Sequence, residues 1–195
     1  MKKQILTVFL GAALLQQMLP VSAADTDSRP LIDDARKAAT RLMTGVRTEL
    51  LRELERSGPV RAIIVCKYSA PEASAAISRE TGMRVTRVSL RPRNPALGEP
   101  DVWEQQILLD FEKRFSAGEK ADAMEYSEIV VEPAGRYFRY MKAIPTAQPC
   151  LACHGPVESI SEAVRAKLNG EYPHDRGVNY RLGQVRGAVS IKKQL

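Results

Sequence analysis

The stretch Cys150-Leu151-Ala152-Cys153-His154 constrains this 195-residue chain more than any other, because C-x-x-C-H is the motif to which haem c is attached. Two thiols three residues apart can each form a thioether with one vinyl group of a haem, and the histidine that follows can ligate the iron. The loop that carries this motif would have to present both cysteines to a rigid porphyrin. We therefore predict one covalent haem c, bound through Cys150 and Cys153, with His154 as an axial ligand.

A C-x-x-C pair is also found in redox disulfides and in zinc sites. Zinc would need a second pair of ligands at metal spacing, whereas the whole chain contains three cysteines and two histidines. A thiol–disulfide oxidoreductase that uses Cys150 and Cys153 without haem therefore remains as the alternative to haem attachment.

The N-terminus has the features of a secretory signal peptide. Two lysines follow Met1, residues 5–15 are apolar, and small residues at 21–23 form a cleavage site. We predict that residues 1–24 are a signal peptide and that residues 25–195 are a single periplasmic domain with no membrane span after cleavage. An uncleaved membrane anchor is the alternative, although the apolar stretch is shorter than the roughly 20 residues that a span needs.

The charge pattern argues against a nucleic-acid partner. The full chain has a net charge of +6, but its lysines and arginines are spread along the sequence and interleaved with acids. We instead expect some of the arginines to face haem propionates, and we expect the partner to be a redox or signalling protein.

Hydrophobic periodicity predicts an α+β domain that begins with a long helix. Helices are predicted at residues 31–55, closed by Ser57-Gly58-Pro59, and at 72–79, 101–117 and about 159–168. Strands are predicted at residues 83–90, 127–132, 136–144 and 185–192. The apolar run 60–66 fits either a buried strand or a buried helix. The short hairpin connection at Pro133-Ala134-Gly135 favours an antiparallel sheet with flanking helices.

Two local patterns make sharper predictions about the C-terminal part. Ser159-Ile160-Ser161-Glu162 has the form of a helix capping box, and Asn169-Gly170 is expected to end that helix. The last strand alternates, which predicts a half-buried strand with one buried face. That face is formed by Val185, Gly187, Val189 and Ile191, and the other by Arg186, Ala188, Ser190 and Lys192.

The second axial ligand has few candidates. Thioethers are available at Met43, Met83, Met124 and Met141, an imidazole at His174, and a thiolate at Cys66. Cys66 is the odd cysteine of an exported protein, so it must be buried or bound to escape oxidation. Its apolar surroundings allow a buried thiol, and an axial thiolate opposite His154 is the other possibility. Such a thiolate would lower the reduction potential of the haem.

Several stretches together resemble the bacterial PAS-like c-type haem domain family. They are Ala62-Ile63-Ile64-Val65-Cys66, Ala70-Pro71, Arg87-Val88-Ser89-Leu90-Arg91-Pro92-Arg93-Asn94-Pro95, Asp101-Val102-Trp103-Glu104, Cys150 to Gly155, Tyr172-Pro173 and Arg186-Gly187-Ala188. Members of this family are exported proteins or the sensory parts of signalling proteins. The resemblance implies a PAS-like fold, covalent haem, and axial ligation by His154 and Cys66. The chain departs from the family at His174, where members often carry an acidic residue.

Two functional classes follow from these predictions. The protein is either a redox or gas sensor that acts through another protein, or a low-potential electron-transfer cytochrome. No further group of residues suggests substrate chemistry at the haem, so we do not expect an enzyme.

Overall fold

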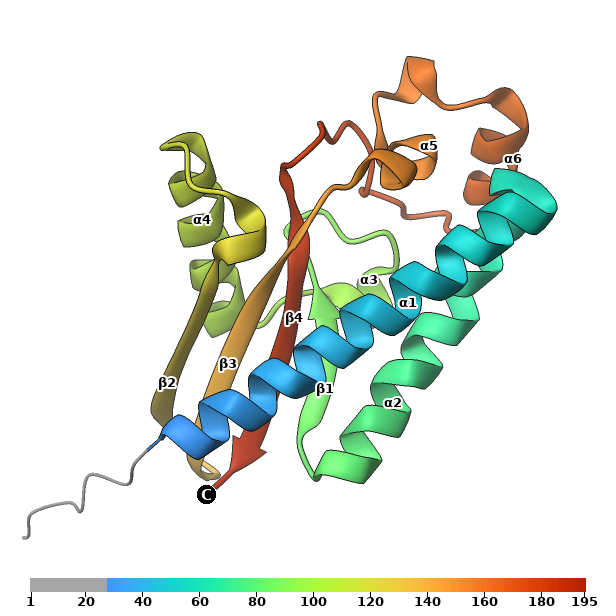
Figure 1. Cartoon of the computed structure of the whole chain (residues 1–195). Coiled ribbons are helices and arrows are strands. Elements are labelled where there is room, and N and C mark those ends of the chain that lie inside the picture. Colours follow the sequence, from blue (N-terminus) through green and yellow to red (C-terminus); the bar gives the residue numbers. More distant parts are fainter. Residues whose placement is uncertain (1–27) are drawn as a thin grey trace, which may run out of the picture.

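The structure is a computed structural model that describes residues 28–195, so the predicted signal peptide and its cleavage site lie outside the described part. One antiparallel sheet has the strand order β1-β4-β3-β2 (Figure 1). Its strands are β1 (Arg84–Val88), β2 (Glu125–Glu132), β3 (Gly135–Pro145) and β4 (Val185–Gln194). The predicted α+β fold, with its long N-terminal helix and its β2–β3 hairpin, is confirmed.

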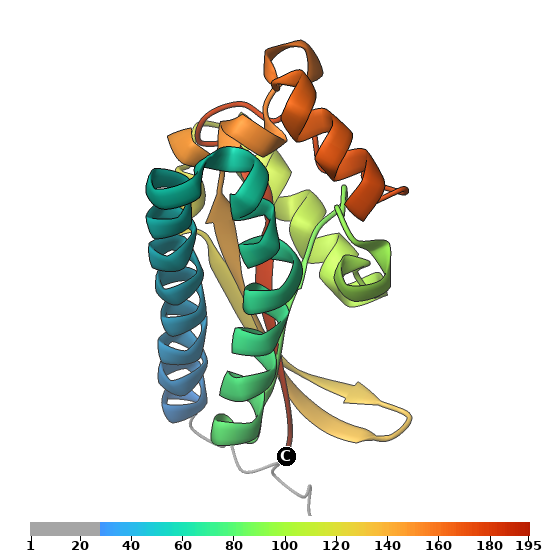
Figure 2. The same cartoon turned by 90° about the vertical axis from the view of Figure 1, so that its right-hand side faces the viewer.

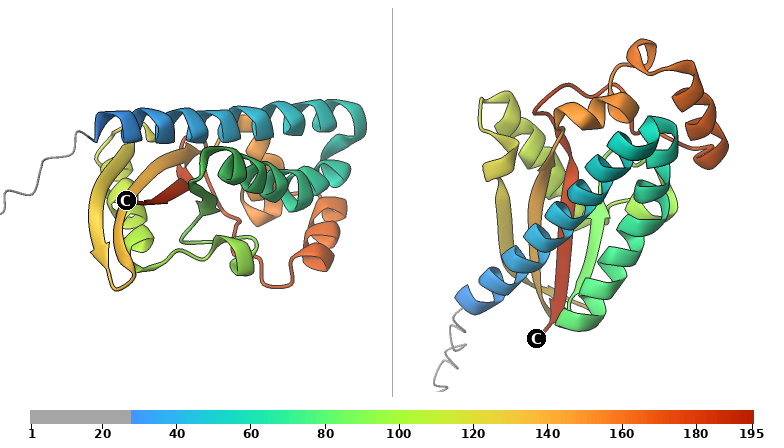
Figure 3. Two further views of the ribbon diagram at one scale, coloured as in Figure 1. Left: turned by 90° about the horizontal axis from the view of Figure 1, so that it is seen from below. Right: turned by 45° about the vertical axis from the view of Figure 1, so that its right-hand side comes forward.

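The chain turns back on itself after a long first helix. Helix α1 (Arg29–Ile64) is interrupted at Gly58, whose φ of 74° and ψ of 177° are not helical. Pro59 then starts a new helical stretch, which passes through the π-helix η1 (Val65–Ser69) into α2 (Ala70–Thr81). The predicted break at Gly58 is confirmed, and the run 60–66 is helical. Because of this turn, α2 lies beside α1 (Figure 3).

Helices cover both faces of the sheet (Figure 2). Helices α1 and α2 pack on one face through a cluster of buried residues: Ala35, Ala38, Ala39, Leu42, Ile77, Met83, Val85, Phe138, Tyr140, Val189 and Ile191. Helix α4 (Val102–Ser116) packs on the other face, where Leu108 and Phe111 are buried. Its predicted start is confirmed, since Asp101 accepts a hydrogen bond from the Glu104 backbone and the Glu104 side chain accepts one from the Asp101 backbone.

Strand β4 lies in the middle of the sheet and is buried on both faces, so the prediction of a half-buried strand is wrong. Ser190, which was predicted on the polar face, is 2% exposed and donates a 2.6 Å hydrogen bond to Glu104 of α4. The alternating pattern did not reveal that both faces are buried. The second face carries the small residues Ala188 and Ser190, which leave room for α4.

A β-bulge also changes the predicted faces of β4. Ile144 pairs with Gly187 but Pro145 pairs with Val185, which leaves Arg186 as the extra residue. Val185 therefore packs with the α4 cluster, on the side opposite to Val189 and Ile191. The bulge directs the Arg186 side chain away from the face on which the alternation had placed it.

The segment between β3 and β4 contains mainly short helical turns. They are η3 (Gln148–Cys150), α5 (Leu151–His154), η4 (Val157–Ser159) and α6 (Glu162–Glu171). Ser161 caps α6 by accepting from the Val164 backbone, so the predicted capping box at Ser159 is wrong. The helix also continues through Asn169 and Gly170, which were predicted to end it, and ends at Glu171. The remaining elements are α3 (Pro95–Gly98) and η2 (Ala121–Ala123).

No helix within residues 28–195 is long and apolar enough to cross a bilayer.

Candidate functional site

The C-x-x-C-H motif follows β3 at one end of the sheet, next to the far end of α1 (Figure 1). Two backbone hydrogen bonds of 2.8 Å join Thr146 to Gln184 and Gly183, so the start of the motif loop is attached to the segment that enters β4. Helical turns then bring Cys150 and Cys153 to one side of the loop, as their spacing of three requires.

Burial suppresses ionisation of the two motif thiols. It raises the pKa of Cys153 to about 11, and it raises the pKa of Cys150 in the same way, with the nearby Cys66 adding to both shifts. The reactive cysteine of a thiol–disulfide oxidoreductase needs a lowered pKa to form a thiolate at neutral pH. The surroundings of Cys150 and Cys153 therefore do not favour that alternative.

The ring of His154 is held through its Nδ1 atom, which lies 2.5 Å from the carbonyl oxygen of Gly177. A carbonyl only accepts hydrogen bonds, so Nδ1 must carry the proton, and Nε2 keeps a free lone pair. The Arg186 Nε atom lies 3.2 Å from the same Nδ1 and cannot donate to it in this tautomer. Burial, together with Arg186 and Arg93, holds the pKa of His154 well below its usual value. The imidazole is therefore neutral and suited to bind a metal through Nε2.

A buried ion pair fixes the loop that supplies this carbonyl. Arg93 Nε donates a 2.8 Å hydrogen bond to Asp175, and the other oxygen of Asp175 accepts from the Gly177 backbone at 2.6 Å. Arg93 also donates to the carbonyls of Cys153 (2.5 Å) and Gly177 (3.2 Å). One guanidinium thus connects the C-x-x-C-H motif to the loop that orients His154.

Cys66 reaches the same place from the other half of the chain. It lies on η1, which follows the short helical stretch after Gly58, and its side chain is half-buried. Two cavities of about 300 and 540 Å³ adjoin here, and both are lined by Cys66 and His154. Cys150 and Cys153 line the smaller cavity, together with apolar residues of α1 such as Leu50. All four predicted haem-binding residues therefore line this pair of cavities.

The other candidates for the second axial ligand lie elsewhere, with one exception. Met83, Met124 and Met141 are buried in the two clusters that join the helices to the sheet, and His174 is exposed and lines neither cavity. Met43 lines the smaller cavity, but it also packs against the α1 cluster.

Three arginines form the part of the lining that both cavities share, and they were not identified individually from the sequence. Arg87, Arg93 and Arg186 line both cavities, and within residues 28–195 the lining of neither cavity includes an aspartate or a glutamate. Burial lowers the pKa of Arg186, which donates to Ser89 (2.9 Å) and to the Arg91 carbonyl (3.2 Å). A space with this lining favours a ligand that is largely apolar and carries negative charge. Their sequence signals were the Arg-rich stretch 87–93 and, for Arg186, the stretch Arg186-Gly187-Ala188 of the family resemblance.

The ion pair of Arg93 with Asp175 is predicted to contribute strongly to stability, because their side chains are only 8% and 11% exposed. In Asp175→Asn, an amide replaces one of the two accepting oxygens and leaves Arg93 without its charge partner. We expect the free energy of unfolding in urea to fall by about 3 kcal/mol. The control is Glu99→Gln, which removes the exposed ion pair between Glu99 and Arg176. This substitution should lower the free energy of unfolding by less than about 1 kcal/mol. Equal effects of the two substitutions would contradict this role of Asp175.

Comparisons with known proteins agree with the family resemblance. A model of the Tll0287-like family matches residues 22–193. Among solved structures, the cyanobacterial haem protein Tll0287 matches with a TM-score of 0.59 and 20% identity, over 87% of this chain and 95% of that one. At this identity the structural match demonstrates a shared fold. No curated protein sequence matches. Because the family model covers most of the sequence, the chain belongs to the Tll0287-like family.

Proposed function

We propose that this protein is an exported redox protein with one haem c, attached to Cys150 and Cys153 and ligated by His154 and Cys66. The observation that supports this most is that Cys66 and His154, far apart in the sequence, line the same cavities beside the C-x-x-C pair. Its solved relative Tll0287 is a haem protein. Residues 1–24 would direct the chain to the periplasm and then be removed.

The residues around the cavities fit a haem. The two cavities have volumes of about 300 and 540 Å³, which fall within the range of cofactor pockets. The wall near the cysteines is apolar, as a porphyrin requires, and His154 has a free Nε2 atom. The bound group would supply a one-electron redox centre. The protein would hold it, exclude water from it and set its potential through Cys66. This role needs no catalytic residue.

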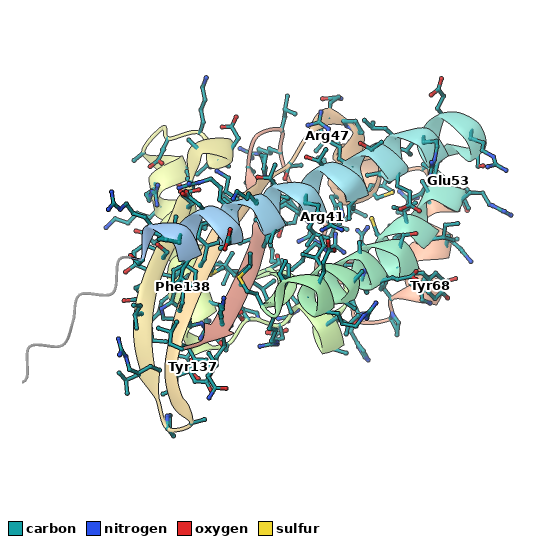
Figure 4. All side chains as sticks on the ribbon, turned by 60° about the horizontal axis from the view of Figure 1, so that its bottom comes forward. Arg41, Arg47, Glu53, Tyr68, Tyr137 and Phe138 are labelled. Carbon is teal, nitrogen blue, oxygen red and sulfur yellow. The ribbon has the colours of Figure 1, made fainter. Side chains whose placement is uncertain are left out.

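Redox sensing is the role that the position of Cys66 favours. Cys66 lies on a π-helical turn, a feature that often marks functional sites in helices. The next residue, Lys67, is hydrogen-bonded to Glu171 of α6, so a shift of η1 would be transmitted to α6. Tyr68 follows and is 62% exposed at the end of the molecule (Figure 4). A signalling partner could therefore detect the state of Cys66 at this surface.

Low-potential electron transfer is the second candidate. The larger cavity is lined in part by the exposed residues Arg79 and Leu97, so a redox partner could approach a bound haem closely there.

Covalent haem attachment is tested by expressing the protein with its signal peptide in cells that have haem-attachment machinery. The pyridine haemochrome spectrum should report one haem per chain that resists extraction. The double variant Cys150→Ala/Cys153→Ala should lose this haem, whereas Cys66→Ala should keep it, because Cys66 forms no thioether. A folded wild-type protein without haem would refute the proposed function.

Axial ligation by Cys66 is tested in the ferric protein by electron paramagnetic resonance. Replacing a thiolate removes negative charge from the iron, so Cys66→Ala should change the low-spin signal and raise the midpoint potential on the order of 0.1 V, within the roughly 0.8 V range of axial ligands. Met43→Leu is the control, because Met43 also lines the smaller cavity. If Met43→Leu changes the signal and Cys66→Ala does not, the ligand assignment is wrong.

Sensing and electron transfer differ in what happens to η1 on reduction. In a sensor that releases Cys66, amide hydrogen exchange in residues 65–69 and in α6 should increase when the protein is reduced. Cys66→Ala should exchange equally in both redox states. Equal exchange in oxidised and reduced wild-type protein would instead favour electron transfer.

A further inference from the structure

We propose that Arg87 binds a propionate carboxylate of the haem, on the side of the site away from Cys150 and Cys153. This inference rests on the proposed function and adds to it the residue that would bind the charged edge of the cofactor.

Arg87 is positioned to reach a ligand from the sheet. It lies on β1, where it pairs with Val189 of the central strand β4, and its half-buried side chain lines both cavities. Among the residues that the structure describes, no side chain or carbonyl forms a hydrogen bond or ion pair with its guanidinium. A partly desolvated cation without a partner is unfavourable, so this position gains from an anionic ligand.

The other two arginines that line both cavities are already engaged. Arg93 donates to Asp175 and to the carbonyls of Cys153 and Gly177. Arg186 donates through Nη1 to Ser89 and to the Arg91 carbonyl. These two residues contribute positive charge to the space, but Arg87 is the one whose whole guanidinium fork is free to bind a carboxylate through two parallel hydrogen bonds.

The two cavities differ in a way that matches the two edges of a haem. Cys150 and Cys153 line only the smaller one. In a haem c the thioether carbons and the propionates are on opposite sides of the porphyrin, so a haem attached at these cysteines would carry its propionates towards the larger cavity. That cavity is lined by five arginines, namely Arg79, Arg84, Arg87, Arg93 and Arg186, and by no acid among the described residues. Two carboxylates would find compensating charge there.

The test compares the purified holoproteins of the wild type, Arg87→Gln, Arg87→Lys and Arg136→Gln. Arg136 is a matched control, because it is an exposed arginine at the far end of β3 that lines neither cavity. Resonance Raman spectra report the propionate bending mode, whose frequency rises with hydrogen bonding. Arg87→Gln should shift this mode to lower frequency and lower the midpoint potential, because a nearby cation stabilises the more negative reduced state. Arg87→Lys should give a smaller shift of both quantities, since lysine keeps the charge but loses the fork.

Each outcome decides the proposal. If Arg87→Gln binds haem normally and its bending mode and potential match those of Arg136→Gln, Arg87 does not bind a propionate. If Arg87→Gln fails to fold, Arg87→Lys decides, and an unshifted bending mode there overturns the assignment. A wild-type protein without haem would refute the proposed function itself, which distinguishes that failure from an error about Arg87.

Discussion

The hydrogen bond between His154 Nδ1 and the Gly177 carbonyl is the contact on which the arrangement of the site depends. It sets the tautomer of a half-buried, neutral imidazole, which lines the same cavities as Cys66. The carbonyl is itself held, because Asp175 and Arg93 fix the loop around Gly177. The motif supplies the imidazole, and a separate loop, joined by one buried ion pair, orients it.

The sheet places this arrangement through its central strand. Strand β4 is last in the sequence but lies between β1 and β3, so the sheet cannot be completed until the C-terminus is in place. The bulge at Arg186 turns a cation towards His154, and the next residue must be glycine, because a Cβ at Gly187 would lie 2.3 Å from the Val88 carbonyl. A strand that forms the core of the fold thus also forms one wall of the cavities.

The local parts of this structure were predictable from the sequence to different degrees. Amphipathic spacing predicted α1 and α4, and the predicted start of α4 at Asp101 was correct because its capping box joins residues only three apart. The S-x-x-E pattern predicted a cap at Ser159, whereas Ser161, two residues later, caps the helix. The faces of β4 were partly wrong, because a bulge has no signature in alternation and small residues on the second face conceal its burial.

At the site, the C-x-x-C-H motif could be recognised from the sequence alone, because the two thiols and the imidazole are close in the chain and their relation is local. The sequence also determined that Cys66 must be buried or bound, and the family resemblance added its expected role. The folded arrangement was needed to show that Cys66 and His154 share a cavity, and that Arg87, Arg93 and Arg186 line it. Those contacts join segments distant in the chain. They depend on the turn at Gly58, the order of the strands and one bulge, so no short-range pattern encodes them.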